Sequence, residues 1–166
     1  KEIQSVFGLA EVSFQNSIFL SFTARNDWSS TLPTDNNSYF YPSVSLTAAL
    51  TDLFDINAPW LSFANIRAAY AEVGGDTNPY NTRNVYNYGN VWGGQFVATE
   101  SSLLRNPELK PERTTSLELG TDLRFLDNRL RVDFTWYDTR SKDQIINLPL
   151  AKSTGYDAKL INAGEI

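Results

Sequence analysis

The chain has 166 residues, a net charge of −5 and neither cysteine nor histidine. The missing residue types exclude disulfides, thiolate or imidazole catalysis and the usual zinc ligands, and the acidic balance excludes the basic surface that nucleic-acid binding requires. We therefore expect no enzyme, no metal site and no cofactor. Aromatic residues make up 13% of the chain, which favours strands. No run approaches the ~18 apolar residues of a transmembrane helix.

Apolar and polar side chains alternate with a period of two through six segments, most clearly in Ile18–Arg25, Val44–Leu50 and Leu130–Tyr137. Strict alternation predicts strands with one apolar and one polar face. In chain order, the predicted strands cover residues 3–14, 17–27, 40–51, 61–73, 114–126 and 129–141. Their length of ~10–13 residues exceeds the ~5–6 of ordinary strands and matches the ~9–11 that cross a bilayer.

The segments that connect these strands alternate in length. Gln15-Asn16 and residues 126–129 form tight turns, residues 52–60 are intermediate, and residues 28–39 and 74–113 are long. Another long polar stretch follows the last predicted strand. Strand counting places every long connector at the same end, as in membrane barrels with short periplasmic turns and long external loops.

Aromatic residues gather near the strand ends, which predicts two belts at the bilayer interfaces. The set toward the tight turns is Phe14, Phe19, Phe54, Trp60, Phe63 and Phe125. The set toward the long connectors is Trp28, Tyr39, Phe40, Tyr41, Trp136 and Tyr137.

Charged side chains also occur within the predicted strands: Arg25, Asp27, Arg67, Glu118, Asp122, Arg124, Arg131 and Asp133. In a protein core each would need a buried partner, whereas facing a water-filled or plugged lumen costs little. The alternation then turns the opposite set toward lipid: Leu117, Leu119, Leu123, Val132, Phe134 and Trp136. Glu118 and Asp122 lie ~13 Å apart along a strand, which is too far for the paired carboxylates of a glycosidase. We expect them instead to form ion pairs with Arg124, Arg131 or a plug. An open antiparallel sheet with this face in solvent is the alternative.

Several segments resemble one receptor family. Asn26–Pro33 with Tyr39–Ser45 resembles an arm between two barrel strands, and Ile66–Gly74 resembles a strand end of pattern R-x-x-Y-x-x-x-G. Asn106–Thr114 resembles the N-P-x-L-K-x-E motif before a later strand, and is the most specific of these matches. Asp133–Asp143 and Ile161–Ile166 resemble the two strands that follow. In this order the motifs are similar to the SusC/RagA-like TonB-dependent outer-membrane receptors of Bacteroidetes.

The resemblance implies an all-β fold, with about six strands of a roughly 22-strand antiparallel transmembrane barrel. Residues 1–166 are then a partial barrel domain, with the plug domain and the remaining strands outside this chain, because six strands cannot close a barrel. The chain also starts without an apolar signal core, so we expect it to begin inside a longer protein.

The same resemblance implies active import of oligosaccharides or peptides across the bacterial outer membrane. The implied partners are a SusD-like surface lipoprotein, TonB acting through the plug, and outer-membrane lipid. A passive porin and a soluble carbohydrate-binding β-sandwich remain alternatives.

Residues 74–113 hold the candidate binding residues. They are four aromatic residues interleaved with amides: Tyr80, Tyr86, Tyr88, Trp92, Asn87 and Asn90. Aromatic faces stack on sugar rings, and amides hydrogen-bond hydroxyl groups. A self-packed external loop or a lipoprotein contact is the alternative. Gly93-Gly94 predicts a turn, and Asp76-Thr77-Asn78 is too short for a calcium loop.

Overall fold

The computed structural model describes the backbone of residues 1–166 and every side chain except that of Asn90. The strands are β1 (Ile3–Phe14), β2 (Ile18–Ser29), β3 (Ser38–Ala49), β4 (Leu61–Gly75), β5 (Tyr86–Trp92), β6 (Gln95–Glu100), β7 (Leu103–Leu104), β8 (Glu112–Phe125), β9 (Leu130–Lys142), β10 (Ile145–Pro149) and β11 (Ala158–Asn162). The helices are α1 (Leu50–Leu53) and the 3₁₀ turn η1 (Lys152–Thr154). Neither helix, and no other in the described chain, is long and apolar enough to span a membrane.

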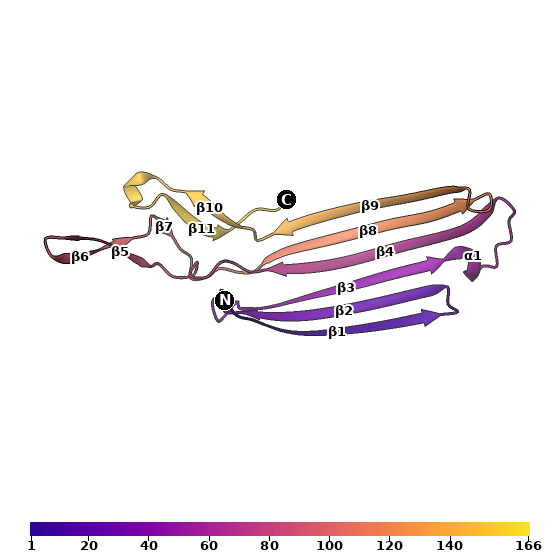
Figure 1. The fold of residues 1–166 in the computed structure, drawn as a ribbon, viewed down its shortest axis with the longest axis horizontal. Coiled ribbons are helices and arrows are strands. Elements are labelled where there is room, and N and C mark those ends of the chain that lie inside the picture. Colours follow the sequence, from indigo (N-terminus) through magenta and orange to yellow (C-terminus); the bar gives the residue numbers. More distant parts are fainter.

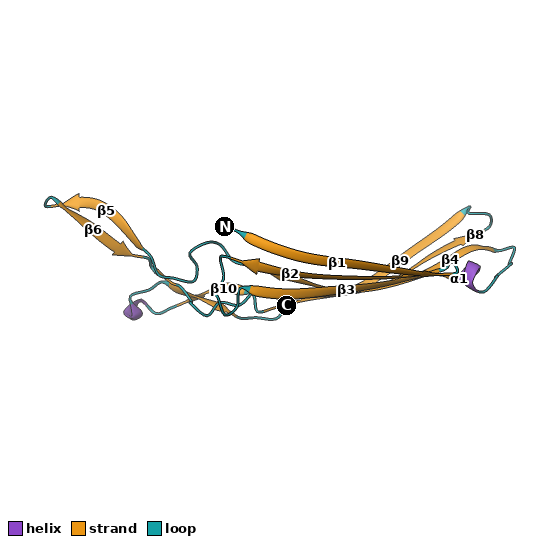
Figure 2. Cartoon of the chain, turned by 90° about the horizontal axis from the view of Figure 1, so that it is seen from below, coloured by secondary structure: helices purple, strands orange, loops and turns teal.

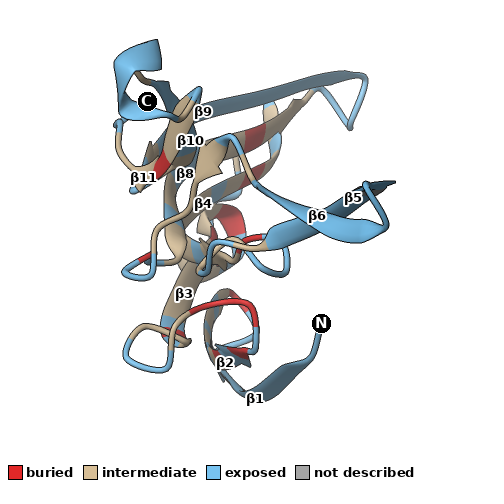
Figure 3. Ribbon diagram, turned by 90° about the vertical axis from the view of Figure 1, so that its left-hand side faces the viewer, coloured by how far each residue is buried: buried red, intermediate tan, exposed pale blue. Residues whose placement is uncertain are grey.

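Six long strands form one antiparallel sheet in the order β1-β2-β3-β4-β8-β9. The predicted meander is confirmed, since each strand pairs with the next long strand along the chain. Figure 1 shows all tight turns at one end of the sheet and the long excursions at the other, as the connector lengths predict. Viewed along the strands, the sheet follows an arc from β1 to β9 (Figure 3), the shape of a curved wall.

Directly paired residues in an antiparallel sheet share a face, so the register assigns each side chain to one of two faces. Leu119 lies opposite Trp136, and Leu123 lies opposite Val132, so the expected lipid-facing residues do share one face, which we call the apolar face. The eight charged residues share the other, which we call the polar face: Arg25, Asp27, Arg67, Glu118, Asp122, Arg124, Arg131 and Asp133. That the polar face lines a lumen stays a prediction.

The prediction of two aromatic belts at the bilayer interfaces was partly wrong. The register places five of the expected belt residues on the polar face: Phe19, Tyr39, Tyr41, Phe63 and Tyr137. The pairing fixes which face a side chain occupies, whatever its own preference for lipid. Two of these rings have charged partners there, because the Tyr41 hydroxyl donates to Asp27 at 2.6 Å and the Arg124 guanidinium lies 4.9 Å from the Phe63 ring. Phe14, Trp28, Phe40, Phe125 and Trp136 lie on the apolar face.

The pairing of β3 with β4 stops before either strand ends. Its last pair toward the long connectors is Ser43 with Ala71, although β4 continues to Gly75. Pro42 comes next in β3 and has no N–H to donate to a ladder. Figure 1 shows the two strands diverging beyond this point. The Tyr39 ring lies against Gly74 there, where any β-carbon would overlap it.

The segment predicted as one long loop, residues 74–113, contains three strands, so that prediction was incomplete. β5 and β6 form a hairpin around the Gly93-Gly94 turn, where both glycines have positive φ, as the dipeptide predicts. The hairpin projects well beyond the end of the main sheet (Figures 1 and 2). A third sheet joins β10 to β11 and β11 to β7, the last pair being parallel.

The register generates a depth-dependent prediction for the apolar face. Phe134 lies at the middle of the apolar rows of β9, so Phe134→Arg should cost ~2–4 kcal/mol of folding free energy in a bilayer. Val132→Arg, nearer the tight turn, should cost less. Urea unfolding of the full-length receptor in lipid vesicles measures both. Ser45→Arg on the polar face is the control and should cost under ~1 kcal/mol; a larger cost for Ser45→Arg than for Phe134→Arg would reverse the two faces.

Candidate functional site

On the polar face, one arginine spans three strands. Arg67 of β4 lies opposite Gly120 of β8, and Gly120 lies opposite Thr135 of β9. The guanidinium crosses Gly120 and donates to Asp133 at 2.7 Å and to Thr135 at 2.6 Å. A β-carbon at Gly120 would overlap the Arg67 side chain, so glycine is what lets the arginine lie flat on the sheet.

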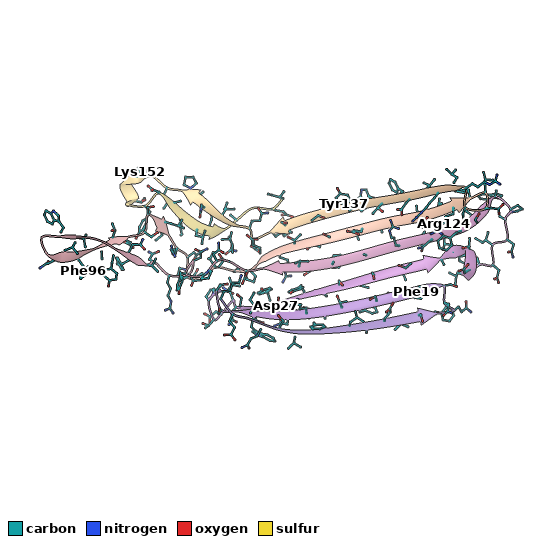
Figure 4. The ribbon with its side chains drawn as sticks, viewed as in Figure 1. Phe19, Asp27, Phe96, Arg124, Tyr137 and Lys152 are labelled. Atoms are coloured by element: carbon teal, nitrogen blue, oxygen red, sulfur yellow. The ribbon has the colours of Figure 1, made fainter. Side chains whose placement is uncertain are left out.

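Asp122 and Asp27 are the two most buried charges of this face, with 6% and 5% of their surface exposed. Asp122 accepts from Arg124 at 3.2 Å and from Arg131 at 3.0 Å, which confirms the predicted ion pairs. Glu118 has no ion pair within the described residues. Near the other end of the face, Arg25 donates to Asp27 at 2.8 Å. Figure 4 shows Asp27 and Arg124 toward opposite ends of the sheet, so the charges are spread along the wall rather than gathered into a catalytic centre.

A small apolar core lies where the long strands end and the long connectors begin. It gives a structural reason for the Asn106–Thr114 motif. Leu109 is fully buried and packs with Leu32, Tyr39 and Leu160. Around it, the Asn106 carboxamide accepts from the Glu108 N–H at 2.9 Å, which fixes the turn before the leucine. Two longer-range contacts tie the motif to the chain end. The Asn162 side chain bonds both the N–H and the carbonyl of Lys110 at 2.8 Å, and the Glu112 carboxylate accepts from the Ile145 N–H at 2.7 Å.

Asp76, the residue after β4, ties several strand ends together, and we call its contacts the Asp76 anchor. Its carboxylate accepts from Lys1 at 2.6 Å, Ser29 at 2.5 Å and Thr31 at 3.1 Å. Burial raises the pKa of Asp76, but the bonds from Lys1, Ser29 and Thr31 outweigh it and hold that pKa below its usual value. These contacts close the ends of β1, β2 and β4 around one charge, so Asp76 has a structural role.

The β5–β6 hairpin carries most of the predicted binding residues. Tyr86 lies opposite Glu100, Tyr88 opposite Ala98, and Val91 opposite Phe96. One extra residue of β5 between Tyr88 and Val91 forms a bulge, which puts Tyr86, Tyr88, Val91 and Phe96 on a single face that we call the hairpin stripe. Tyr88 and Phe96 are 81% and 78% exposed, and Figure 4 shows Phe96 far from the main sheet.

The other predicted residues lie elsewhere. Trp92 is 83% exposed but lies on the opposite face with Gln95, and Asn87 is also on that face, opposite Thr99. The Asn90 side chain lies outside the described residues. Sequence reasoning missed Phe96, which only the bulge aligns with the tyrosines. Its signal was the alternation of Phe96 and Ala98 after the Gly93-Gly94 turn.

Tyr80 belongs to the base of the hairpin rather than to its stripe. Its carbonyl accepts from the Arg105 guanidinium, and the Asn84 carboxamide accepts from the Arg105 N–H at 2.9 Å. Glu100, at the end of β6, accepts from the Tyr156 hydroxyl at 2.8 Å. The hairpin is therefore fixed at its base and exposed along both faces. No group of acidic residues suited to a metal ion occurs in the part of the chain that the structure describes.

A family model described as "TonB dependent receptor-like, beta-barrel" matches residues 1–166. The chain belongs to this family and is part of an antiparallel transmembrane β-barrel of the bacterial outer membrane. This confirms the predicted family, fold class and localisation, and it excludes the soluble β-sandwich.

Relatives and solved structures agree with this assignment. The chain is 30% identical to TonB-dependent receptor P3 of Formosa agariphila, across 99% of this chain and 17% of that protein. It is 28% identical to TonB-dependent receptor SusC of Bacteroides thetaiotaomicron, across 94% of this chain and 16% of that protein. The chain thus spans less than a fifth of the length of these relatives.

Among solved structures, the fold matches a chain of the RagAB peptide transporter with a TM-score of 0.89 at 23% identity, over 98% of this chain and 18% of that chain. It also matches the siderophore receptor PirA from Acinetobacter baumannii with a TM-score of 0.65 at 16% identity, over 98% of this chain and 24% of that chain. Both likenesses support the barrel fold.

The Arg67 crossing generates a test by double-mutant cycle. Gly120→Val should displace the guanidinium and cost about 1 kcal/mol of folding free energy, and Arg67→Ala should cost a similar amount. Because both changes break the same contacts, the double variant should cost clearly less than their sum in urea titrations in vesicles. Strictly additive costs would show that Arg67 does not depend on Gly120.

The Asp76 anchor should be sensitive to acid. A carboxylate whose folded pKa is lowered stabilises the fold above its unfolded pKa of ~3.9, and this contribution is lost as the pH falls through the still lower folded value. Hydrogen exchange of residues 28–37 should therefore accelerate as the pH falls below ~4, after correction for intrinsic rates. Asp76→Asn should exchange faster already at neutral pH and lose the acid dependence; an unchanged pH profile in Asp76→Asn would contradict the assignment.

Proposed function

We propose that the chain is a wall segment of an active importer that takes up oligosaccharides or peptides with a SusD-like lipoprotein. TonB acts through a plug domain that, like the remaining strands, lies outside this chain, and the protein is not an enzyme. The single observation that carries the proposal is the match of the whole chain to the TonB-dependent receptor barrel family. TonB dependence favours active import over a passive porin.

Within that importer, we assign the recognition role to the β5–β6 hairpin. It leaves the sheet at the end of the long connectors, which is the external end of such barrels. Its stripe presents two tyrosines and a phenylalanine to solvent, and a group of exposed apolar side chains of this kind is typical of an interaction site. The aromatic faces suit stacking on sugar rings or on the side chains of a peptide.

The low charge of the hairpin supports a neutral polar ligand. The described residues of β5 and β6 include one ionisable carboxylate, Glu100, and this group is already bonded to Tyr156. Tyrosine hydroxyls add donors and acceptors at the edge of the rings. A stripe of this kind binds by contact area with few directional bonds, which suits a neutral substrate or a lipoprotein surface.

The β5–β6 hairpin can be deleted without removing the Arg105 contacts at its base or any strand of the six-stranded sheet. Removing residues 86–100 and joining the stumps with glycines keeps Tyr80, Asn84 and Arg105, which hold the base together. The full-length deletion variant should reach the outer membrane at normal levels, because β4 and β8 keep their own pairing. It should grow poorly on the cognate nutrient as sole carbon or nitrogen source, or lose the lipoprotein on purification.

Point variants separate the stripe from the rest of the hairpin. Tyr88→Ser with Phe96→Ser removes the two most exposed rings of the stripe, whereas Val97→Ser with Thr99→Ala changes the opposite face of β6. Only the first pair should reduce uptake or lipoprotein retention, by about tenfold if two aromatic contacts are lost. Normal uptake and normal partner retention in both the deletion and the stripe variant would refute the recognition role.

A further inference from the structure

A pocket of about 560 Å³ lies at the base of the β5–β6 hairpin, and we call it the base pocket. Three separate parts of the chain line it, namely Lys1, the connector segment 30–34 and the segment 79–83, with Pro107 beside them. Its volume falls within the ~300–1,000 Å³ that is typical of ligand sites. Of the binding residues predicted from the sequence, Tyr80 lines this pocket rather than the hairpin stripe.

The walls of the base pocket are held in place by contacts within the chain. On one side, Leu32 is buried and the Thr31 hydroxyl donates to Asp76 at 3.1 Å. On the other side, the Asn106 N–H donates to the Asn81 carbonyl at 3.3 Å. A ligand therefore meets walls whose positions are set before it binds, which lowers the entropic cost of binding.

The backbone of Tyr80 has an unfavourable conformation at this pocket. Its φ is 66°, in the left-handed region that a bulky residue rarely adopts. The Arg105 guanidinium donates to the Tyr80 carbonyl, and this bond fixes the conformation. Tyr80 is nevertheless 74% exposed, so packing of its ring does little to offset the strain. Backbone strain that packing does not explain points to a functional role for the ring.

Arg83 gives the base pocket its charge. Lys1 also lines the pocket, but its ammonium group is paired with Asp76 at 2.6 Å. Arg83 is exposed and forms no ion pair with any residue that the structure describes. A guanidinium can bind an oxyanion such as a carboxylate through two parallel hydrogen bonds. The charge of the pocket therefore favours a ligand with an anionic group.

The remaining lining favours a sugar over a peptide. Thr34 and Thr82 add hydroxyl groups, which can donate to and accept from the hydroxyl groups of a sugar. The exposed Tyr80 ring can stack on a pyranose ring. Three lining residues have no N–H to donate: Pro33, Pro79 and Pro107. An extended peptide, which is bound largely through backbone hydrogen bonds, therefore finds fewer donors in this pocket.

We propose that the base pocket binds an acidic sugar unit of the imported oligosaccharide, with Arg83 bound to its carboxylate or sulfate and Tyr80 stacked on its ring. This inference rests on the proposed import function and narrows its substrate class. The hairpin stripe, which carries little charge, contacts neutral units of the same oligosaccharide. The substrate is then an oligosaccharide in which uronic acids or sulfated sugars occur among neutral sugars.

Calorimetric titration of the purified full-length receptor with defined oligosaccharides tests the proposal. The probes are oligosaccharides that carry glucuronate, galacturonate or sulfate, each paired with its carboxyl-reduced or desulfated counterpart of the same length. At least one acidic probe should bind about tenfold more tightly than its neutral counterpart. The pair that shows the difference identifies the acidic group as a carboxylate or a sulfate.

Variants of the two pocket residues assign the preference to the base pocket. Arg83→Gln should lower the affinity for the acidic probe about tenfold and leave that for the neutral counterpart unchanged. Arg83→Lys keeps the charge without the two parallel bonds, so it should retain part of the preference. Tyr80→Asn removes the ring but tolerates a positive φ, so it should weaken both members of a pair by a similar factor.

Arg129→Gln is the matched control. Arg129 is also exposed and without an ion pair among the described residues, but it lies at a tight turn. This variant should bind as the wild type does, and heat-dependent gel mobility verifies that every variant folds.

Three outcomes would overturn the proposal: equal affinity within every pair of probes, no binding of any acidic probe, or an acid preference that survives in Arg83→Gln. The titration involves neither TonB nor the lipoprotein. The importer role is tested separately by TonB-dependent growth on the nutrient, so the failure of one can be told from the failure of the other.

Discussion

The structure depends on one constraint, which is that a membrane wall must satisfy its own backbone hydrogen bonds. Six strands of 12 to 15 residues meet it by continuous antiparallel pairing, since an unpaired group in lipid costs several kcal/mol. Continuous pairing fixes one register, and the register divides every side chain between two faces. The apolar rows and the crossing of Arg67 over Gly120 both follow from that register. Between β3 and β4 the pairing ends at Ser43 and Ala71, next to Pro42, and the Tyr39 ring lies against Gly74 there. Between β4 and β8 the register shifts between Leu61 and Phe63.

The long strands were predictable because their alternation is a local property of the sequence. Leu130–Tyr137 shows its two faces without any knowledge of its neighbours, and the tight turns at Gln15-Asn16 and Asp127-Asn128 set the pairing order. Tyr39, Tyr41 and Tyr137 were misplaced because the aromatic belts were predicted from closeness to a strand end and not from the alternation. Tyr137 lies on the face of Arg131 and Asp133, as the alternation of β9 itself indicates, and Tyr39 and Tyr41 lie opposite Asp27 and Arg25 on the same polar face.

The long connectors that contain β5–β7 and the segment with β10 and β11 were less predictable, because their structure depends on contacts between residues far apart in the chain. The hairpin strand Tyr86–Trp92 has asparagines and a glycine where a strand would have β-branched residues, and its bulge breaks the alternation. The parallel pairing of Leu103-Leu104 with β11 leaves no local signal. In contrast, the Asn106–Thr114 motif was found by resemblance, and the structure gives it a physical basis in the burial of Leu109 and the clamp from Asn162.

The central claim is that the tight turns and the β5–β6 hairpin lie on opposite sides of the outer membrane. The chain has no cysteine. Single cysteines introduced into a full-length receptor whose other cysteines, where present, are replaced can therefore report this directly. Phe96→Cys marks the hairpin, and Arg129→Cys marks a tight turn; both side chains are exposed. A membrane-impermeant maleimide should label Phe96→Cys in intact cells and label Arg129→Cys only after the outer membrane is permeabilised. Labelling of Arg129→Cys in intact cells, with Phe96→Cys protected, would contradict the orientation and the functions derived from it.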